Sequence, residues 1–212
     1  MIGRLLDRIV ERYPTEALEV GEFSCLKANG MRFTVRAYYA KGLGRVSVMQ
    51  ASGFFGLMRM DTLMITPTET ELPLYSYDRI YAMGNDTLIV ELYDTLTSPF
   101  SEKALLSAKE AYAHLPERDP GTHWYDAIKL PSSISKKGKK KQTAELDALA
   151  LAHLDAFLAS AAPTADPVKK AERSAAYVDG LLANGGPSTD VFKKTLGEEK
   201  TARLFHEVLF GA

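Results

Sequence analysis

Three apolar runs separated by glycine-containing turns follow one another between residues 31 and 66, which read MRFTVRAYYAKGLGRVSVMQASGFFGLMRMDTLMIT. Their length and partly alternating pattern predict β-strands over Met31 to Ala40, Arg45 to Ala51 and Leu57 to Thr66. Turns this short join strands that are neighbours and run antiparallel. We therefore expect an antiparallel meander at the centre of the fold.

Similar runs extend the meander in both directions. Phe23 to Leu26 precedes it, and Tyr77 to Met83 follows it. The next run, Thr87 to Tyr93, can pair with its predecessor through the turn Gly84-Asn85-Asp86. Gly and Asn tolerate the positive φ that tight hairpins require. The sequence thus predicts about six consecutive strands.

Helical patterns occupy both ends of the chain. Apolar residues at helical spacing, bounded by proline or glycine, predict helices over Ile2 to Tyr13, Ser101 to Leu115, Thr143 to Ala161, Asp166 to Leu182 and Thr189 to Leu209. Strands in the middle and helices at both ends specify the α+β class, in which helices cover the faces of an antiparallel sheet. The length of 212 residues predicts a single domain over 1–212.

The composition argues against several classes of protein. Lys plus Arg number 26 and Asp plus Glu 27, and a net charge of -1 does not fit a general nucleic-acid coat. Cys25 is the only cysteine, so we expect no disulfide, no cysteine-rich metal site and a cytoplasmic location. The most apolar stretch, Leu146 to Ala162, carries Asp147, His153 and Asp155. We therefore expect no membrane span, and neither a nucleic acid nor a membrane as partner.

Familiar motifs of catalysis are missing from the sequence. It contains no nucleophile elbow, no Gly-x-Gly-x-x-Gly and no Gly-Lys-Thr or Gly-Lys-Ser loop. The four histidines, at 114, 123, 153 and 206, lie in separate segments, which does not favour a histidine metal site. Aromatic residues such as Tyr125, Tyr177 and Phe205 could line a flat pocket, although such residues are mostly core.

One acidic residue interrupts an otherwise apolar strand. The segment PTETELPLYSYD, residues 67–78, ends on Asp78, which lies between Tyr77 and Arg79. Burial would raise the pKa of this carboxyl, so that Asp78 could hold a proton near neutral pH and deliver it to a ligand. The alternative is a structural contact with Arg79 or with a turn, and spacing alone favours that alternative.

A cluster of five lysines precedes the third predicted helix. The run SKKGKKK, residues 135–141, contains Lys136, Lys137, Lys139, Lys140 and Lys141. Such a run is usually a solvated loop. Alternatively, it could attract an anionic partner, either an acidic protein or a ligand with carboxylates.

The order of these segments resembles the ferredoxin-dependent bilin reductases. Ile65 to Asp78, followed by LIVELYDTL at 88–96, is similar to that family's pattern of Leu-Pro-Leu-aromatic, two residues, Asp and a hairpin strand ending in aspartate. Later segments are similar to its C-terminal half in order and rough spacing, namely Trp124, Lys129-Leu130-Pro131, DAFL at 155–158, Tyr177, LGE at 196–198 and VLF at 208–210. The resemblance spans roughly residues 31 to 210 and is greatest to the phycocyanobilin:ferredoxin oxidoreductase branch. The red chlorophyll catabolite reductases are related to this family.

The resemblance implies an α/β/α sandwich whose pocket, between the sheet and the C-terminal helices, holds a linear tetrapyrrole. It implies an oxidoreductase without a bound metal or organic cofactor, which takes single electrons from reduced ferredoxin and reduces a biliverdin-like bilin through a radical. Such a reaction would belong to haem catabolism.

The resemblance also assigns roles to individual residues. It gives Asp78 the role of main proton donor. It places Thr62 and Gln50 where the phycocyanobilin-forming branch has a histidine and a glutamate, and neither replacement can titrate near neutral pH. Arg45 would pair with a bilin propionate.

A second aspartate of the family falls near Gly185-Gly186, where Asn184 and Asp190 are the nearest polar residues. The lysines at 136, 137, 139, 140 and 141 would dock the acidic ferredoxin. Two alternatives stay open: a reductase of an open-chain chlorophyll catabolite, and a bilin-binding carrier that has lost its chemistry.

Overall fold

A computed structural model describes residues 1–212, except for the side chain of Pro187. Its centre is an eight-stranded sheet of order β1-β3-β4-β5-β6-β7-β8, with β2 pairing to β3 as well. All pairings are antiparallel. The strands are β1 (Thr15–Leu18), β2 (Cys25–Ala28), β3 (Met31–Ala40), β4 (Gly44–Gly53), β5 (Met58–Pro67), β6 (Leu74–Ala82), β7 (Asn85–Tyr93) and β8 (Ile134–Lys139).

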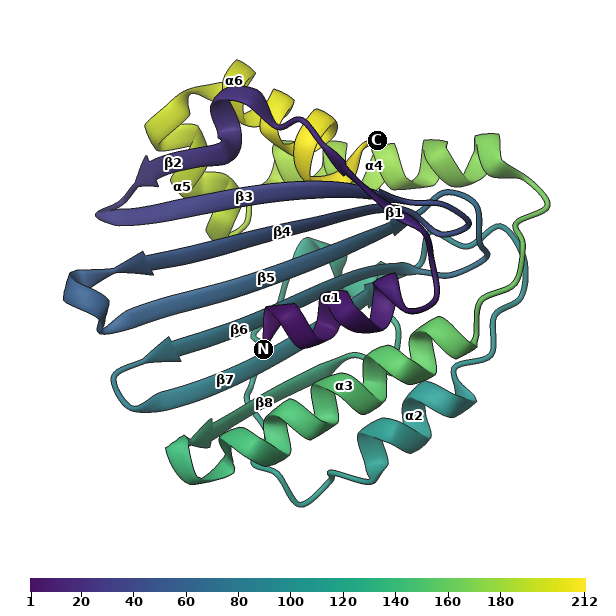
Figure 1. The fold of residues 1–212 in the computed structure, drawn as a ribbon, viewed down its shortest axis with the longest axis horizontal. Helices are drawn as coiled ribbons and strands as arrows, with labels where there is room; N and C mark the ends of the chain where they lie inside the picture. Colours follow the sequence, from purple (N-terminus) through teal and green to yellow (C-terminus); the bar gives the residue numbers. More distant parts are fainter.

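Helices cover both faces of this sheet (Figure 1). One face carries α1 (Ile2–Val10), α2 (Lys103–Glu110) and α3 (Thr143–Ala159). The other carries α4 (Pro167–Asn184), α5 (Pro187–Leu196), α6 (Glu198–Arg203) and a final π-helical segment, η5 (Leu204–Phe210). The predicted α+β class is confirmed, with the layers of an α/β/α sandwich.

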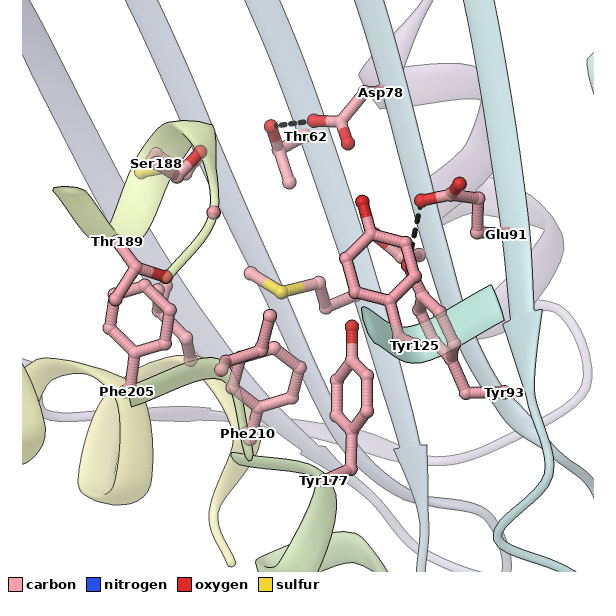
Figure 2. Close-up of a pocket in the computed structure, with 16 residues that line it drawn as sticks. Thr62, Asp78, Glu91, Tyr93, Tyr125, Tyr177, Ser188, Thr189, Phe205 and Phe210 are labelled. Carbon is pink, nitrogen blue, oxygen red and sulfur yellow. Dashed lines mark hydrogen bonds between the residues drawn. The ribbon is translucent and has the colours of Figure 1, made fainter. Parts of the chain in front are cut away.

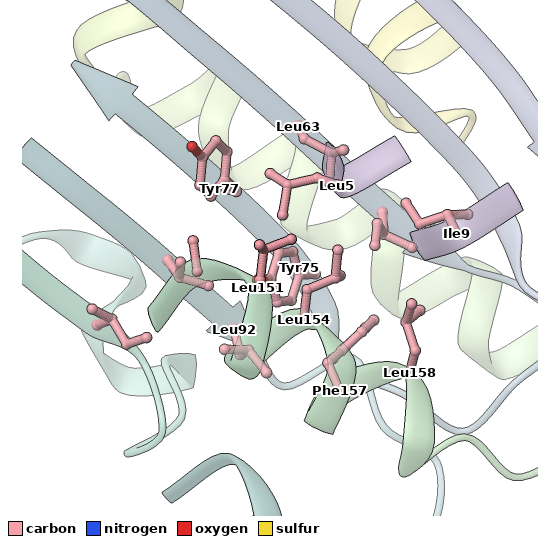
Figure 3. Close-up of a cluster of buried hydrophobic side chains, with 14 of the residues drawn as sticks. Leu5, Ile9, Leu63, Tyr75, Tyr77, Leu92, Leu151, Leu154, Phe157 and Leu158 are labelled. Atoms are coloured by element: carbon pink, nitrogen blue, oxygen red, sulfur yellow. The ribbon is translucent and has the colours of Figure 1, made fainter. Parts of the chain in front are cut away.

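The face under α1 and α3 is the larger apolar core (Figure 3). Leu5 and Ile9 of α1 pack against buried strand residues that include Leu63 and Tyr75, and Phe157 of α3 lies 4.7 Å from the Tyr75 ring, centroid to centroid. Successive strand residues point to opposite faces of a sheet. The odd-numbered residues of β6 therefore face this core, and the even-numbered ones face the C-terminal helices.

This alternation separates Asp78 from its neighbour in the sequence. Arg79 is fully buried on the α3 side, where its Nη2 lies 2.8 Å from Oδ2 of Asp86 and 3.3 Å from the carbonyl oxygen of Thr143. Asp78 lies on the other face, beside Thr62. The alternative prediction of an Asp78–Arg79 contact is wrong.

The lysine run is not a solvated loop, because it contains the edge strand β8. Lys136 is buried, and its Nζ donates to the carbonyl oxygen of Leu115 at 2.9 Å and to Glu117 at 2.5 Å. Lys137, Lys139, Lys140 and Lys141 are exposed. Charged residues on an edge strand discourage pairing with other chains, and the same charges hid this strand from the apolar pattern.

Several predicted boundaries also differ from the structure. The strand predicted from Tyr77 begins at Leu74, and the helix predicted over Ser101 to Leu115 is shorter, Lys103–Glu110. The strand β1 was not predicted, because four residues give too short a pattern. The strand predicted over Phe23 to Leu26 begins instead at Cys25, after a 3-10 turn over Gly21–Ser24. The helix predicted over Thr189 to Leu209 is divided at Gly197, whose φ of 82° lies in the left-handed region that glycine tolerates.

The C-terminal segments cover their face unevenly. η5 packs on β4 and β5, and α5 lies against β2. Toward β6 and β7 the cover is the 3-10 segment η3 (Trp124–Ile128), which packs on Tyr93 through Tyr125. Between these two covers the sheet keeps polar residues under a cavity. None of the helices described is long and apolar enough to cross a membrane.

Candidate active site

A cavity of about 110 Å³ lies between the sheet and the C-terminal helices (Figure 2). Its floor comes from strands β4 to β7, and its walls come from η3, α4, the start of α5 and η5. The lining residues are Met49, Thr62, Met64, Ser76, Asp78, Glu91, Tyr93, Tyr125, Tyr177, Leu181, Gly186, Ser188, Thr189, Phe205, Leu209 and Phe210. The floor is therefore partly polar, and the walls are largely aromatic.

Asp78 occupies this floor without a basic partner. It stands opposite Thr62 of β5, whose hydroxyl donates to its Oδ1 at 2.5 Å. Burial raises the pKa of Asp78 to about 6, a rise that the hydrogen bond from Thr62 opposes and the charge of Glu91 reinforces. A carboxyl with this pKa exchanges a proton close to neutral pH, as a general acid must.

Glu91 supplies a second carboxylate to the cavity. Its Oε2 accepts from the Tyr93 hydroxyl at 2.6 Å, and its Oε1 lies 3.7 Å from Nζ of Lys129. Lys129 is shared with Asp126, whose Oδ1 is 2.5 Å from the same Nζ. Glu91 is thus partly compensated by a cation and by a hydroxyl donor, unlike Asp78.

Three tyrosines form one wall of the cavity. The ring centroid of Tyr93 lies 4.4 Å from that of Tyr177 and 5.4 Å from that of Tyr125. Phe210 continues the wall at 5.8 Å from Tyr177. Figure 2 shows the Tyr177 hydroxyl pointing into the cavity on the side of the sheet floor. The wall offers flat apolar surfaces tipped with hydroxyl groups, which suits a flat conjugated ligand.

Burial keeps these hydroxyls protonated. It raises the pKa of Tyr93, Tyr125 and Tyr177 above the ordinary value of 10.0, and nearby carboxylates add to the rise. At neutral pH the tyrosines therefore serve as hydrogen-bond donors rather than as bases. Among the cavity residues, Asp78 is the carboxyl whose pKa is raised toward neutral pH.

A close packing contact positions the Tyr125 wall. Trp124 lies across α4 where Gly180 has no side chain, and a Cβ built at Gly180 would be 2.3 Å from the indole ring. The indole Nε1 donates to the carbonyl oxygen of Gly185 at 3.3 Å. Gly180 thereby lets η3 dock on α4, and this contact places Tyr125 over the floor.

The rim beside α5 is built from small residues. Gly186, Ser188 and Thr189 line the cavity there, directly after Gly185, whose φ is 79°. Glycine gives the backbone more conformational freedom than any other residue. The positive φ of Gly185 lets the chain reverse here from α4 into α5.

The structure places one of the five predicted substrate-binding residues in the cavity. Thr62 lines it beside Asp78. Gln50 faces the α1 side of the sheet, where it accepts from Arg36 at 3.1 Å and donates to Asp61 at 2.9 Å. The prediction that Gln50 lines the pocket is wrong because Met49, not Gln50, pairs with Thr62, and neighbours on a strand face opposite sides.

Arg45 has the right face but a different partner. Its guanidinium donates to the carbonyl oxygen of Val208, at 3.1 Å from Nε and 2.9 Å from Nη2, and also to that of Glu207. It therefore clamps the end of η5 and does not line the cavity, contrary to the prediction that it would bind a propionate.

Asn184 and Asp190 lie beside the α4–α5 turn, and both are exposed. The side chain of Asn184 donates to the carbonyl oxygen of Gly180 at 3.0 Å, which closes the end of α4. Neither side chain lines the cavity, whose rim here consists of Gly186, Ser188 and Thr189. In this structure the two residues therefore lie outside the cavity, and their contact with a ligand stays a prediction.

The sequence analysis missed Glu91 and Tyr93. Both belong to β7, and Glu91 stands directly opposite Ser76. The alternation of side chains could have revealed them. Across the hairpin Glu91 pairs with Ser76 and Tyr93 pairs with Leu74, so both lie on the face of the sheet that carries Asp78. Tyr125, Tyr177 and Phe205 were named as possible pocket residues, and they do line the cavity.

Comparison with known proteins gives a likeness in structure alone. No protein-family model matches the chain, and no curated protein matches it in sequence. The crystal structure of phytochromobilin synthase from tomato in complex with biliverdin is similar, with a TM-score of 0.75 at 12% sequence identity. The match covers 96% of this chain and 79% of the tomato protein. The chain shares the fold of that synthase.

Proposed function

We propose that this protein is a ferredoxin-dependent bilin reductase, an oxidoreductase that reduces a biliverdin-like linear tetrapyrrole with Asp78 as main proton donor. One observation carries the proposal. A carboxyl whose pKa is raised to about 6, with no basic partner, lies on the floor of an aromatic cavity, in a fold shared with a synthase crystallised with biliverdin. The proposed haem-catabolic role and cytoplasmic location follow from this reaction and from the single cysteine.

Reducing one double bond of the bilin consumes two electrons and two protons, and two molecules of reduced ferredoxin, each giving one electron, become oxidised. Asp78 gives one proton to the bilin after the first electron has made it a radical, and this leaves the Asp78 carboxylate. The second proton comes from solvent and passes Glu91 and the Tyr93 hydroxyl that is hydrogen-bonded to it, both of which line the same cavity. A further solvent proton restores the Asp78 carboxyl for the next turnover.

The cavity residues suit the binding of such a substrate. Pyrrole N–H groups are donors, and the Asp78 and Glu91 carboxylates are acceptors on the floor below them. The rings of Tyr125 and Tyr177 supply flat surfaces for stacking. Pockets for ligands of this kind usually hold at least about 300 Å³, whereas this cavity holds about 110 Å³. Binding therefore requires the rim to open, and we assign that movement to the α4–α5 turn.

The proposed electron donor is an acidic ferredoxin. Four exposed lysines, Lys137, Lys139, Lys140 and Lys141, remain candidates for docking it, whereas Lys136 is buried in contacts of its own. Complementary charge increases the rate of encounter in transient complexes. No organic cofactor or metal is required by the protein in this scheme.

The test is an anaerobic assay followed by visible absorbance. Biliverdin is added first, and ferredoxin, ferredoxin reductase and NADPH follow. The proposal predicts a shift of the bilin spectrum on binding and then conversion to a new pigment. Binding without conversion would instead support the carrier or a chlorophyll catabolite as substrate, and absence of binding would contradict the proposal as a whole.

Ferredoxin docking has a separate test. Replacing Lys137, Lys139, Lys140 and Lys141 by glutamine should raise the KM for ferredoxin and flatten the salt dependence of the rate. A matched variant replaces four exposed lysines elsewhere, Lys41, Lys103, Lys169 and Lys194. Equal kinetics in the two variants would exclude this run as the docking site.

A further inference from the structure

Two hairpin tips at one end of the sheet expose unusually large apolar side chains. In the β4–β5 tip, Phe55 is fully exposed and Leu57 is 73% exposed. In the β6–β7 tip, Met83 is 93% exposed. These are the three most exposed large apolar side chains among the described residues, and Figure 1 shows both tips at the same end of the sheet.

The backbone of the two tips is also unfavourable for the residues it carries. Phe54, Phe55 and Met83 have φ values of 51°, 57° and 51°, in the left-handed region. Bulky residues rarely adopt that region, and glycine or asparagine is usual at such turn positions. The left-handed backbone at these positions and the exposed apolar area both cost folding free energy. An external surface that takes up these side chains would offset part of that cost.

Cations surround the tips. Lys27 and Arg32 pair directly across β2 and β3, and the same cross-strand row continues through Ser52 to Arg59. Like charges placed directly opposite each other are destabilising. Within the described chain, none of Lys27, Arg32 and Arg59 is part of an ion pair, whereas Lys200 and Arg203 both pair with Glu22.

A hollow of about 450 Å³ lies between the two tips. Leu57 and Met83 line it together with Arg59 and Lys140. The Arg59 guanidinium lies 4.9 Å from the centre of the Tyr81 ring, a stacked position that leaves its N–H groups free for an acceptor. Asp86 also lines the hollow, but its carboxylate is already paired with Arg79. Arg59 and Lys140, which are in no ion pair among the described residues, thus leave positive charge between apolar rims, which fits a lipid phosphate group.

We infer that this end of the sheet, consisting of the two tips and the cations Lys27, Arg32, Arg59 and Lys140, binds the surface of an anionic lipid bilayer. The apolar side chains enter the interface, and the cations contact the headgroups. Attachment of this kind combines buried apolar area with attraction to anionic lipid. The absence of an apolar span led us to expect no membrane partner, but attachment through the tips needs no span.

The shape of this end favours a bilayer over an acidic protein. The apolar side chains belong to two separate tips with the hollow between them, so a rigid partner would need to match both tips at once. A fluid interface adapts to both tips at once. The inference does not depend on the proposed bilin chemistry, because Asp78 lies on the sheet floor and not at the tips.

The test is cosedimentation of the purified protein with vesicles. Vesicles of phosphatidylcholine with about a third phosphatidylglycerol should bind it, pure phosphatidylcholine should bind it weakly, and salt should reduce the binding. The double variant Phe55→Ser, Leu57→Ser should have a vesicle partition coefficient lower by about tenfold or more, because each apolar side chain contributes to insertion. The double variant Arg32→Gln, Arg59→Gln should lose binding to the anionic vesicles selectively.

Val168→Ser is the matched control. Val168 is 69% exposed at the start of α4, which begins at the end of the sheet opposite the tips. This variant should bind like the wild type. All variants should remain folded and should keep the wild-type biliverdin spectrum.

Equal binding of the wild type and the tip variant, or no binding of the wild type to anionic vesicles, would overturn the inference. The inference would also be overturned if the wild type did not bind vesicles while the tip variant lost ferredoxin-supported turnover. That outcome would identify an acidic protein as the partner of this surface.

Discussion

Adjacent residues of β6 show two opposite ways of burying a charge. Arg79 faces α3, and its guanidinium is met by Asp86, the Thr143 carbonyl oxygen and Asp147, which lies 3.4 Å away. Asp78 faces the C-terminal helices and receives a single hydrogen bond, from Thr62. The first charge is neutralised by an opposite charge, and the second is not.

This difference distinguishes scaffold from site. A buried ion pair with additional hydrogen bonds holds strands and helix in register, and here the countercharge comes from the chain itself. A buried carboxyl without a countercharge destabilises the empty protein, and it is useful only if something else takes its proton or fills its acceptor positions. This contrast is why the proposed function places the proton donor on the face with Asp78.

The largest effect should come from breaking the ion pair. Asp86→Asn removes the closer of the two carboxylates beside the buried Arg79 guanidinium and leaves Asp147 at 3.4 Å. Loss of one partner of a buried ion pair typically costs up to about 3–5 kcal/mol of unfolding free energy. Urea unfolding measures this loss. Glu22→Gln, in the exposed pairs with Lys200 and Arg203, should have little effect. Equal losses in the two variants would show that the Arg79 pair is not a structural anchor.

A packing change on the site face should come next. Gly180→Ala drives a methyl group into the Trp124 ring, where the clash distance is 2.3 Å. We expect a loss of about 1–3 kcal/mol in stability and weaker biliverdin binding, because Tyr125 moves with η3.

The control is Gly3→Ala in α1, where no described atom lies within 4 Å of the added methyl group. That change should be neutral or slightly stabilising. If Gly180→Ala were destabilised but bound biliverdin with unchanged affinity, the position of η3 would not matter for binding.

Removing the charge of Asp78 should stabilise the protein, in contrast to Asp86→Asn. Because burial raises the pKa of Asp78 from 3.8 to about 6, the folded state binds the proton more tightly than the unfolded state. The unfolding free energy of the wild type therefore falls as pH rises from about 4 to about 6. Asp78→Asn should exceed the wild type by about 1–3 kcal/mol at pH 8 and should match it near pH 4.

Thermal unfolding at the two pH values measures that difference. A variant that is less stable than the wild type at pH 8 would mean that the Asp78 carboxylate is stabilised by contacts, as the Arg79 guanidinium is.

The smallest expected effect is a shift in the pKa of Asp78 itself. Thr62→Val removes the one hydrogen bond that lowers the pKa of Asp78, so the pKa should rise further above about 6, by roughly one unit. Thr62→Ser keeps a hydroxyl and should keep the wild-type value. Infrared absorbance of the Asp78 carboxyl, followed against pH, measures this pKa in both variants. An unshifted titration in Thr62→Val would show that the Thr62 contact is not made in solution.

The contrast between the two faces could be predicted only in part from the sequence. Apolar runs with glycine turns were enough for the central strands, and Asp78 stood out because an acid interrupts a strand. The face that each residue occupies depends on register, and a slip of one residue reverses it. Gln50 was placed in the pocket by such a slip, since the partner of Thr62 is Met49.

Long-range contacts account for the remaining differences. The Arg45 guanidinium is taken by carbonyl groups of η5, more than a hundred and sixty residues away in sequence. The lysine run has the composition of a loop, yet pairing with β7 makes it a strand and burial of Lys136 orients it. Neither partner can be identified from local pattern, because tertiary contacts override local propensity.

The central claim is that the uncompensated carboxyl of Asp78 protonates a reduced bilin. Anaerobic single-turnover absorbance spectroscopy tests it most directly, with biliverdin bound to the wild type and to Asp78→Asn and reduced ferredoxin added to each. The account predicts that the variant binds biliverdin and accepts the first electron, but stalls as a bilin radical while the wild type proceeds to product. Conversion of biliverdin by Asp78→Asn at the wild-type rate would contradict it.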